Sequence, residues 1–186
     1  MEERRLKNKN RFKITKWRVV FLSFFFLILL RICFFSNYVV EGHSMKPTLE
    51  EGNLLVVNTF VYHVQEPKRF DIVVFKQGEN SDHYVKRVIG LPGEKIEYLN
   101  DVLYINDKAI NENFIKEQKD NMIRNNLTGN FTLKDLTGEE VVPKGHLFVI
   151  GDNRLGSYDS RHFGFVKMDD IVGKVNMRYW PLGGIE

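Results

Sequence analysis

The stretch that decides the fold runs from Tyr84 to Gly93 and reads Y-V-K-R-V-I-G-L-P-G. Apolar and aromatic residues dominate its first part and it ends in Pro-Gly, which is typical of a strand that leads into a turn. Successive side chains of a strand point to opposite faces, so Lys86 shares a face with Tyr84 and Val88. Arg87 then points to the other face. The sequence therefore predicts a strand that carries a lysine in an otherwise apolar row.

Similar short apolar runs lie on both sides of this strand. They are Tyr38–Val40, Leu54–Val57, Asp71–Phe75, Ile96–Leu99, Val102–Ile105, Leu147–Ile150 and Val172–Trp180. Most are bounded by turn-forming or charged residues, as buried strands are. Asn100 and Asp101 join two of the runs, and both residue types tolerate left-handed backbone, which predicts a hairpin. The pattern predicts a mainly β domain over residues 37–186.

Residues 107–140 interrupt the β pattern. They are rich in asparagine, lysine and glutamate and show little periodicity. We expect a variable surface excursion there, with a short helix and no chemical role. The single cysteine, Cys33, excludes an intrachain disulfide.

The run from Val19 to Phe35 is apolar except for Ser23 and Arg31. A bilayer core of about 30 Å needs roughly 20 helical residues, and an arginine near one end can reach the headgroups. We therefore expect a transmembrane anchor over residues 17–36. A cleaved secretory signal is the alternative, but the residues before Ser36 are bulkier than a cleavage site requires.

Charge is distributed unevenly along the chain. The formal net charge is +3, yet residues 1–18 alone carry +6, so the remainder carries −3. This asymmetry predicts a basic cytoplasmic tail over residues 1–16 and places residues 37–186 outside the cell membrane. The lipid bilayer is an expected partner. Nucleic acid is not, because the positive charge does not lie on the folded domain.

The candidate nucleophile is Ser44, in the stretch G-H-S-M-K-P-T-L that begins at Gly42. We expect extended backbone here, because a proline disfavours helix in the residue before it. A serine near glycine and proline is also typical of an ordinary turn, so the assignment depends on a suitable base. His43 is adjacent and would point to the opposite face of an extended segment.

Lys86 is the preferred base. A desolvated lysine favours its neutral form and can then accept a proton. An exposed lysine on an edge strand is the alternative. The G-x-S-x-G pattern of a serine–histidine enzyme fails because position 46 is lysine, and no zinc-binding H-E-x-x-H spacing occurs. We expect no metal and no cofactor.

A third polar stretch follows the predicted strand Leu147–Ile150. It runs from Gly151 to Arg161 and reads G-D-N-R-L-G-S-Y-D-S-R. It lacks the full acidic spacing of a calcium-binding EF-hand loop. Taken alone, it is a polar loop.

Together these stretches resemble bacterial type I signal peptidase, or leader peptidase, in its short single-span Gram-positive form. The motifs are G-H-S-M-K-P-T-L, F-D-I-V-V-F, H-Y-V-K-R-V-I-G-L-P-G-E and G-D-N-R-L-G-S-Y-D-S-R. They stand in the family's order, and the resemblance covers roughly residues 15–105 and 143–182. It implies one transmembrane helix followed by a coiled, partly barrel-like β-sheet domain. The implied activity is that of a membrane-bound serine endopeptidase that removes N-terminal signal peptides from secreted precursors. Cleavage would follow small residues at −1 and −3.

The resemblance also implies the site residues. Ser44 is the implied nucleophile, Lys86 the general base, and Ser157 the hydroxyl that hydrogen-bonds and orients the lysine. The implied supporting residues are Arg87, Asp152 and the ion pair of Asp159 with Arg161, and the implied substrate-contacting residues are Val40, Gly42, Met45, Leu49, Tyr84 and Val85. The implied partners are secreted precursors and, functionally, the secretion translocase.

Two positions depart from the family pattern. Gly42 stands where some members have a serine that donates to the oxyanion, and Phe70 stands where many have glycine. Two other classes of protein remain open. One is a self-cleaving Ser–Lys regulatory protein, which would have a DNA-binding motif in place of the apolar run. The other is a membrane-tethered β module without activity.

Overall fold

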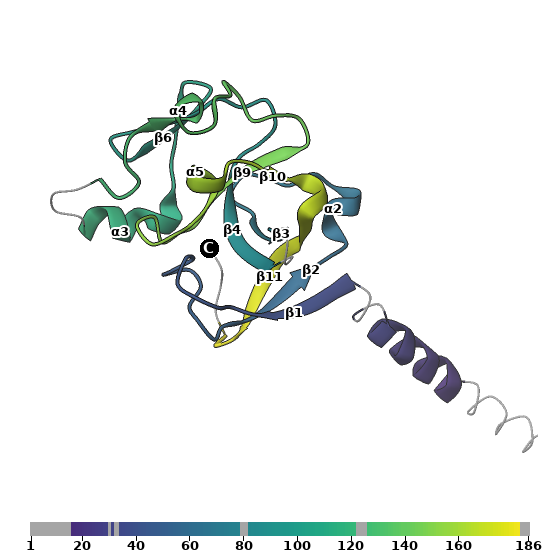
Figure 1. Ribbon diagram of the computed structural model, residues 1–186. Helices are drawn as coiled ribbons and strands as arrows, with labels where there is room; N and C mark the ends of the chain where they lie inside the picture. The colour runs from purple at the N-terminus through teal and green to yellow at the C-terminus, as the bar shows by residue number, and fades with distance from the viewer. Residues whose placement is uncertain (1–15, 30, 32–33, 79–81, 122–125, 183–186) are drawn as a thin grey trace, which may run out of the picture. The chain divides into compact units, whose positions relative to one another are not determined.

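The computed structural model describes residues 16–29, 31, 34–78, 82–121 and 126–182 (Figure 1). The chain divides into two compact units, Met1–Phe35 and Ser36–Glu186.

In the first unit, residues 16–29 form a helix with exposed side chains. Within the described ranges, the structure contains no helix whose length and apolarity would suffice to cross a membrane. Positions 30, 32 and 33 of the expected anchor over 17–36 lie outside the described residues. The expected tail also lies outside them, apart from Lys16.

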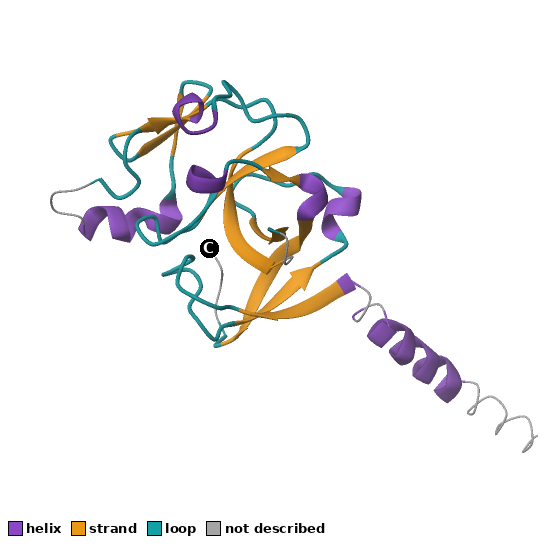
Figure 2. Ribbon diagram, viewed as in Figure 1, coloured by secondary structure: helices purple, strands orange, loops and turns teal. Residues whose placement is uncertain are grey.

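The second unit is built on a seven-stranded sheet with the order β1-β2-β11-β3-β4-β9-β10. Its strands are β1 (Phe35–Val39), β2 (Leu54–Asn58), β3 (Ile72–Gln77), β4 (Asp82–Gly90), β9 (His146–Ile150), β10 (Val166–Lys167) and β11 (Ile171–Trp180). Figure 2 shows these strands curving strongly. In the described part of the chain β1 and β10 are the two edges of the sheet, so the sheet is coiled but forms no closed barrel.

A second sheet of four strands has the order β7-β6-β5-β8. Its strands are β5 (Ile96–Leu99), β6 (Val102–Ile105), β7 (Lys108–Ile110) and β8 (Phe131–Thr132). The predicted hairpin joins β5 to β6, with φ of 49° at Asn100 and 63° at Asp101. These left-handed values explain why the turn uses asparagine and aspartate.

The described helical elements of this unit are short. They are α2 (Val61–Val64), η1 (Asn113–Ile115), α3 (Lys116–Asn121), α4 (Leu133–Thr137), α5 (Ser160–Phe163) and η2 (Met168–Asp170). Residues 107–140 thus supply two strands and three of these helices, and they bury Glu112, Ile115 and Leu133. The expected surface excursion is only partly at the surface, because several of its apolar residues, such as Ile115 and Leu133, are buried in the core.

Strand β4 is an interior strand of the coiled sheet, antiparallel to β3 on one side and β9 on the other. Apolar clusters cover both of its faces, so Lys86 and Arg87 are both buried although they point in opposite directions. The predicted strand is confirmed.

Candidate active site

Ser44 lies in a compact turn. The Lys46 amide donates to the His43 carbonyl at 3.2 Å, and the Leu49 amide donates to the Met45 carbonyl at 2.9 Å. The expectation of extended backbone is therefore wrong at Ser44. The reason is that proline restricts only the residue immediately before it, here Lys46, and leaves Ser44 free to turn.

Lys86 points at this turn. Its Nζ donates to Ser44 Oγ at 2.8 Å and to its neighbour's carbonyl, that of Val85, at 3.1 Å. The residue is 2% exposed. Burial lowers the pKa of Lys86 to about 8, against the opposing effect of the negative charge of Asp159. About a tenth of such a lysine is neutral at pH 7, which is enough for it to accept a proton.

The side chain of His43 makes its described polar contact outside this pair. It is more than half exposed, and its Nε2 is 3.6 Å from Glu51 Oε2. The base expected from the sequence therefore reaches Ser44, and the adjacent histidine makes no hydrogen bond to it among the described residues.

The loop from Gly151 to Arg161 lies against the same site. Arg161 donates to both carboxylate oxygens of Asp159, at 2.8 and 2.9 Å, and the Gly151 amide donates to it at 3.0 Å. Burial alone would raise the pKa of Asp159, but the hydrogen bonds and charge of Arg161 outweigh it and hold this pKa below its usual value. The expected ion pair is formed, and it keeps a negative charge near Lys86.

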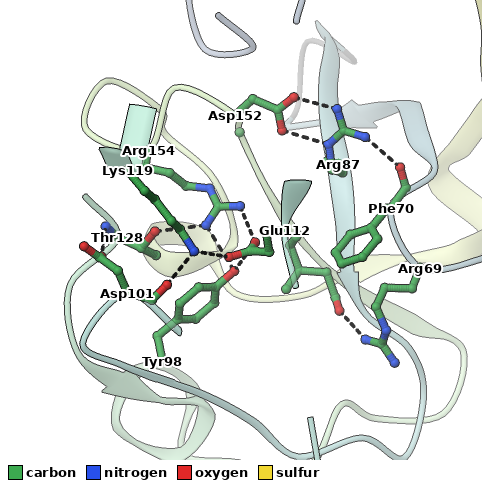
Figure 3. Close-up of polar contacts among 12 residues, drawn as sticks. Arg69, Phe70, Arg87, Tyr98, Asp101, Glu112, Lys119, Thr128, Asp152 and Arg154 are labelled. Atoms are coloured by element: carbon green, nitrogen blue, oxygen red, sulfur yellow. Dashed lines mark hydrogen bonds and ion pairs between the residues drawn. The ribbon is translucent and has the colours of Figure 1, made fainter. Parts of the chain in front are cut away.

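Arg87 and Asp152 form a second, fully buried pair (Figure 3). Nε of Arg87 donates to Oδ1 of Asp152 at 2.9 Å and Nη2 donates to Oδ2 at 2.7 Å. Thr48 Oγ1 donates to the same carboxylate at 2.5 Å. The adjacent Asn153 amide donates to the Ser44 carbonyl at 3.0 Å. The loop thus fixes the turn that carries Ser44. The roles of Thr48 and Asn153 in this contact were not predicted from the sequence.

Ser157 is buried, and no hydrogen bond of ordinary geometry reaches its Oγ among the described residues, although its hydroxyl lies near enough to Asp159 to help lower the pKa of that carboxyl group. The hydrogen bond expected between it and Lys86 is therefore not made in this structure. The Ser157 side chain also packs closely against Gly151. A Cβ on Gly151 would lie 2.2 Å from Ser157 Oγ and 2.4 Å from the Ser44 carbonyl oxygen. Only glycine fits at position 151.

A groove of about 730 Å³ opens over Ser44 and Lys86. Five residues expected to contact substrate line it, namely Val40, Gly42, Met45, Tyr84 and Val85. Leu49 does not line it, since it is completely buried in the apolar cluster behind. The expectation for Leu49 is wrong because the turn at residues 42–49 folds this side chain inward. The sequence analysis missed Tyr38, His83 and Tyr158 in the lining.

Comparison with known proteins identifies the family. The family model described as signal peptidase, peptidase S26, matches residues 13–180. The chain belongs to this family. Members of this family are serine peptidases, so this chain is a serine peptidase, as the motifs indicated.

Individual relatives agree with the family assignment. Signal peptidase I of Bacillus caldolyticus is 57% identical over 152 residues, which cover 82% of this chain and 83% of that protein. Signal peptidase IB of Staphylococcus aureus strain COL is 40% identical over 174 residues, 91% of each chain. A crystal structure of a signal peptidase I from Enterococcus faecalis is 44% identical. It has a TM-score of 0.57 and covers 61% of this chain and 99% of that one. The mainly β fold is therefore the fold of a signal peptidase.

Proposed function

We propose that this chain is a membrane-bound endopeptidase that removes N-terminal signal peptides from secreted precursors, with Ser44 as nucleophile and Lys86 as general base. The names of the family and of its relatives describe peptidases that act on signal peptides. The observation that carries the assignment of residues is the 2.8 Å hydrogen bond between Lys86 Nζ and Ser44 Oγ, made by a lysine whose pKa burial lowers to about 8.

The reaction follows from this geometry. Neutral Lys86 takes the proton of Ser44 as Oγ attacks the carbonyl carbon of the scissile bond. The tetrahedral intermediate collapses to an acyl ester, and the protonated lysine gives its proton to the leaving amine of the mature protein. Lys86 then deprotonates a water, which attacks the ester and releases the signal peptide as a carboxylate. The serine regains its proton and the cycle closes.

Stabilisation of the oxyanion falls to backbone groups. Gly42 offers no side-chain donor, so the Ser44 amide is the donor that the turn provides for the developing charge.

Ser157 is proposed as the hydroxyl that orients Lys86 once substrate closes the site. In this role Ser157→Ala should lower kcat more than it raises KM, and a variant with normal kcat would remove Ser157 from the mechanism.

Substrate would bind extended, by main-chain hydrogen bonds along the strands that border the groove. Val40, Met45 and Tyr84 are among the residues that line the groove beside Ser44. Shallow apolar walls of this kind favour small side chains, which supports cleavage after small residues at −1 and −3.

The location proposed for the enzyme follows from the charge asymmetry of the sequence. Residues 1–16 would be a cytoplasmic tail, 17–36 an anchor, and 37–186 an extracytoplasmic catalytic domain. This arrangement would hold the domain at the membrane surface, where the secretion translocase delivers precursors.

The test is cleavage of a synthetic signal-peptide substrate by the full-length chain in detergent. Ser44→Ala and Lys86→Ala should each abolish cleavage, and the double variant should be no worse, because the two residues act as one unit. His43→Ala, the matched control in the same turn, should keep most of the activity. A parent chain without activity would favour the inactive β module, and cleavage only of the chain itself would favour the self-cleaving class.

A further inference from the structure

Two buried arginines lie against one aromatic ring. The Arg87 guanidinium carbon is 3.9 Å from the centroid of the Phe114 ring, and that of Arg154 is 5.8 Å from it. Phe114 belongs to η1, within the segment 107–140 for which the sequence predicted no chemical role. A guanidinium over an aromatic face is attracted to it, most strongly where water is excluded.

Arg154 is also held by a buried carboxylate. Its Nη2 donates to Glu112 Oε1 at 2.5 Å, and neither side chain has any exposed area (Figure 3). Tyr98 donates to the same oxygen at 2.7 Å, and Lys119 donates to Oε2 at 3.1 Å. Glu112 immediately precedes η1, so one short stretch of the segment 107–140 contacts both arginines.

These arginines support three consecutive residues beside Ser44. The three residues are Asp152, Asn153 and Arg154. Arg87 donates two hydrogen bonds to the first of them, Asp152. The middle residue, Asn153, donates its amide to the Ser44 carbonyl and its side-chain Nδ2 to the His43 carbonyl at 3.1 Å. The turn that carries Ser44 therefore depends on the orientation of a tripeptide that is anchored at both ends.

We propose that Phe114 and Glu112 are positioning residues for the Ser44–Lys86 pair. The proposal rests on the proposed function. The ring of Phe114 fixes the plane of the Arg87 guanidinium, and Glu112 fixes Arg154, so that Asp152–Arg154 hold the serine turn at the distance that Lys86 needs. Neither residue touches substrate or the reacting atoms.

The consequence can be measured through Lys86. If the serine turn shifts, the 2.8 Å hydrogen bond lengthens and water reaches Nζ. Hydration restores the charged form, so the pKa of Lys86 rises from about 8 toward its ordinary value. The titratable side chains near Lys86 are Asp159 on the loop and Tyr84 on its own strand, and those that line the groove with it are Tyr38, Glu41, His43, Asp82, His83 and Tyr158. Substitution of Phe114 leaves all of them in place.

The experiment compares Phe114→Leu with Phe165→Leu in the full-length chain. Phe165 packs against the same apolar cluster as Phe114, but its described ring contacts are to His146 and Phe148 and not to an arginine. Phe114→Leu should lower kcat about tenfold, because a displaced serine turn misaligns Ser44 with Lys86, with KM changed less than about twofold. The midpoint of its pH–rate profile should move to higher pH. Phe165→Leu should lower Tm and leave kcat and the midpoint unchanged.

Two further variants complete the test. Phe114→Tyr keeps the aromatic face and should restore both kcat and the midpoint. Glu112→Gln keeps the shape but leaves Arg154 without its counter-charge, and should lower kcat with the same alkaline shift. If Phe114→Leu loses stability as Phe165→Leu does, with kcat and midpoint unchanged, Phe114 is packing alone and the proposal is wrong. Activity that survives Ser44→Ala would instead contradict the proposed function, so the two failures are distinguishable.

Discussion

At the scale of single residues, the burial of Lys86 that favours activity also lowers the stability of the fold. Its pKa falls on folding from 10.5 to about 8 because burial disfavours its charge. The unfolded chain therefore binds this proton more tightly than the folded one. The resulting penalty on folding is present in full below about pH 8 and disappears above about pH 10.5, where both states are neutral.

This sign predicts the behaviour of Lys86→Met. The uncharged chain of similar length relieves a penalty of at most about 3 kcal/mol near pH 7, a figure reduced by loss of the hydrogen bond to Ser44. The variant should be inactive and yet at least as stable as the parent at pH 7, with less advantage at pH 10. Thermal unfolding at the two pH values checks this. An inactive variant that is clearly less stable at pH 7 would make Lys86 a structural cation.

Gly151 gives a second residue-scale prediction. A Cβ there would overlap both Ser157 and the backbone carbonyl of Ser44, and backbone cannot yield as a flexible side chain does. Gly151→Ala should displace the serine turn and lower kcat severely, with a stability loss of about 1 to 3 kcal/mol, the range seen for overpacked cores. Kinetics and thermal unfolding on the same preparation measure both effects. Normal kcat would show that the turn tolerates displacement.

At the scale of elements, the Arg87–Asp152 pair joins β4 to the loop after β9. Both side chains are almost fully buried, so removing one charge leaves the other buried without a partner of opposite charge. Asp152→Asn should lower the free energy of unfolding by about 3 kcal/mol, whereas the double variant Arg87→Leu with Asp152→Leu should recover much of that loss. Both variants should be inactive, because the serine turn has lost the support of the Arg87–Asp152 pair.

Denaturant unfolding of the two variants, with the parent as reference, measures these differences. A double variant that is no more stable than Asp152→Asn would mean that the pair stabilises the fold outright. In that case the desolvation cost would be smaller than the burial of both charges implies.

Local sequence was sufficient to predict most of the described strands, but not β7, β8 or β10 or the positions of the short helices. The β-branched runs at β3 and β4 and the Asn-Asp turn between β5 and β6 carry their signals within a few residues. The pairing of Ser44 with Lys86 came from motif resemblance. Phe70 shows what local signals miss, since its φ of 69° lies in the left-handed region that favours glycine, the residue that the family resemblance led us to expect there.

Long-range contacts could not be predicted in this way. Glu112 and Phe114 lie in a polar, aperiodic segment, and only the tertiary fold brings them to Arg154 and Arg87. The inward turn of Leu49 and the buried hydroxyl of Ser157 are likewise properties of packing. Such contacts have no signature at short sequence separation.

At the scale of the whole molecule, the proposed topology makes a prediction about access. Protease added to intact protoplasts should degrade residues 37–186 and spare the basic tail, because the cationic residues before the apolar run are expected to stay in the cytoplasm. Immunoblots against the two ends would record the result. Protection of the large domain in intact protoplasts, with digestion only after lysis, would reverse the proposed orientation.

The central claim is that neutral Lys86 activates Ser44, and the most direct test is the pH dependence of kcat/KM for cleavage of a signal-peptide substrate. The ratio reports the free enzyme, so it should rise with a midpoint near pH 8 as Lys86 loses its proton. Lys86→Arg should show no activity at any pH, since guanidinium keeps its proton throughout this range. A midpoint near pH 6.5, typical of histidine, or activity that persists in Lys86→Arg, would contradict the account.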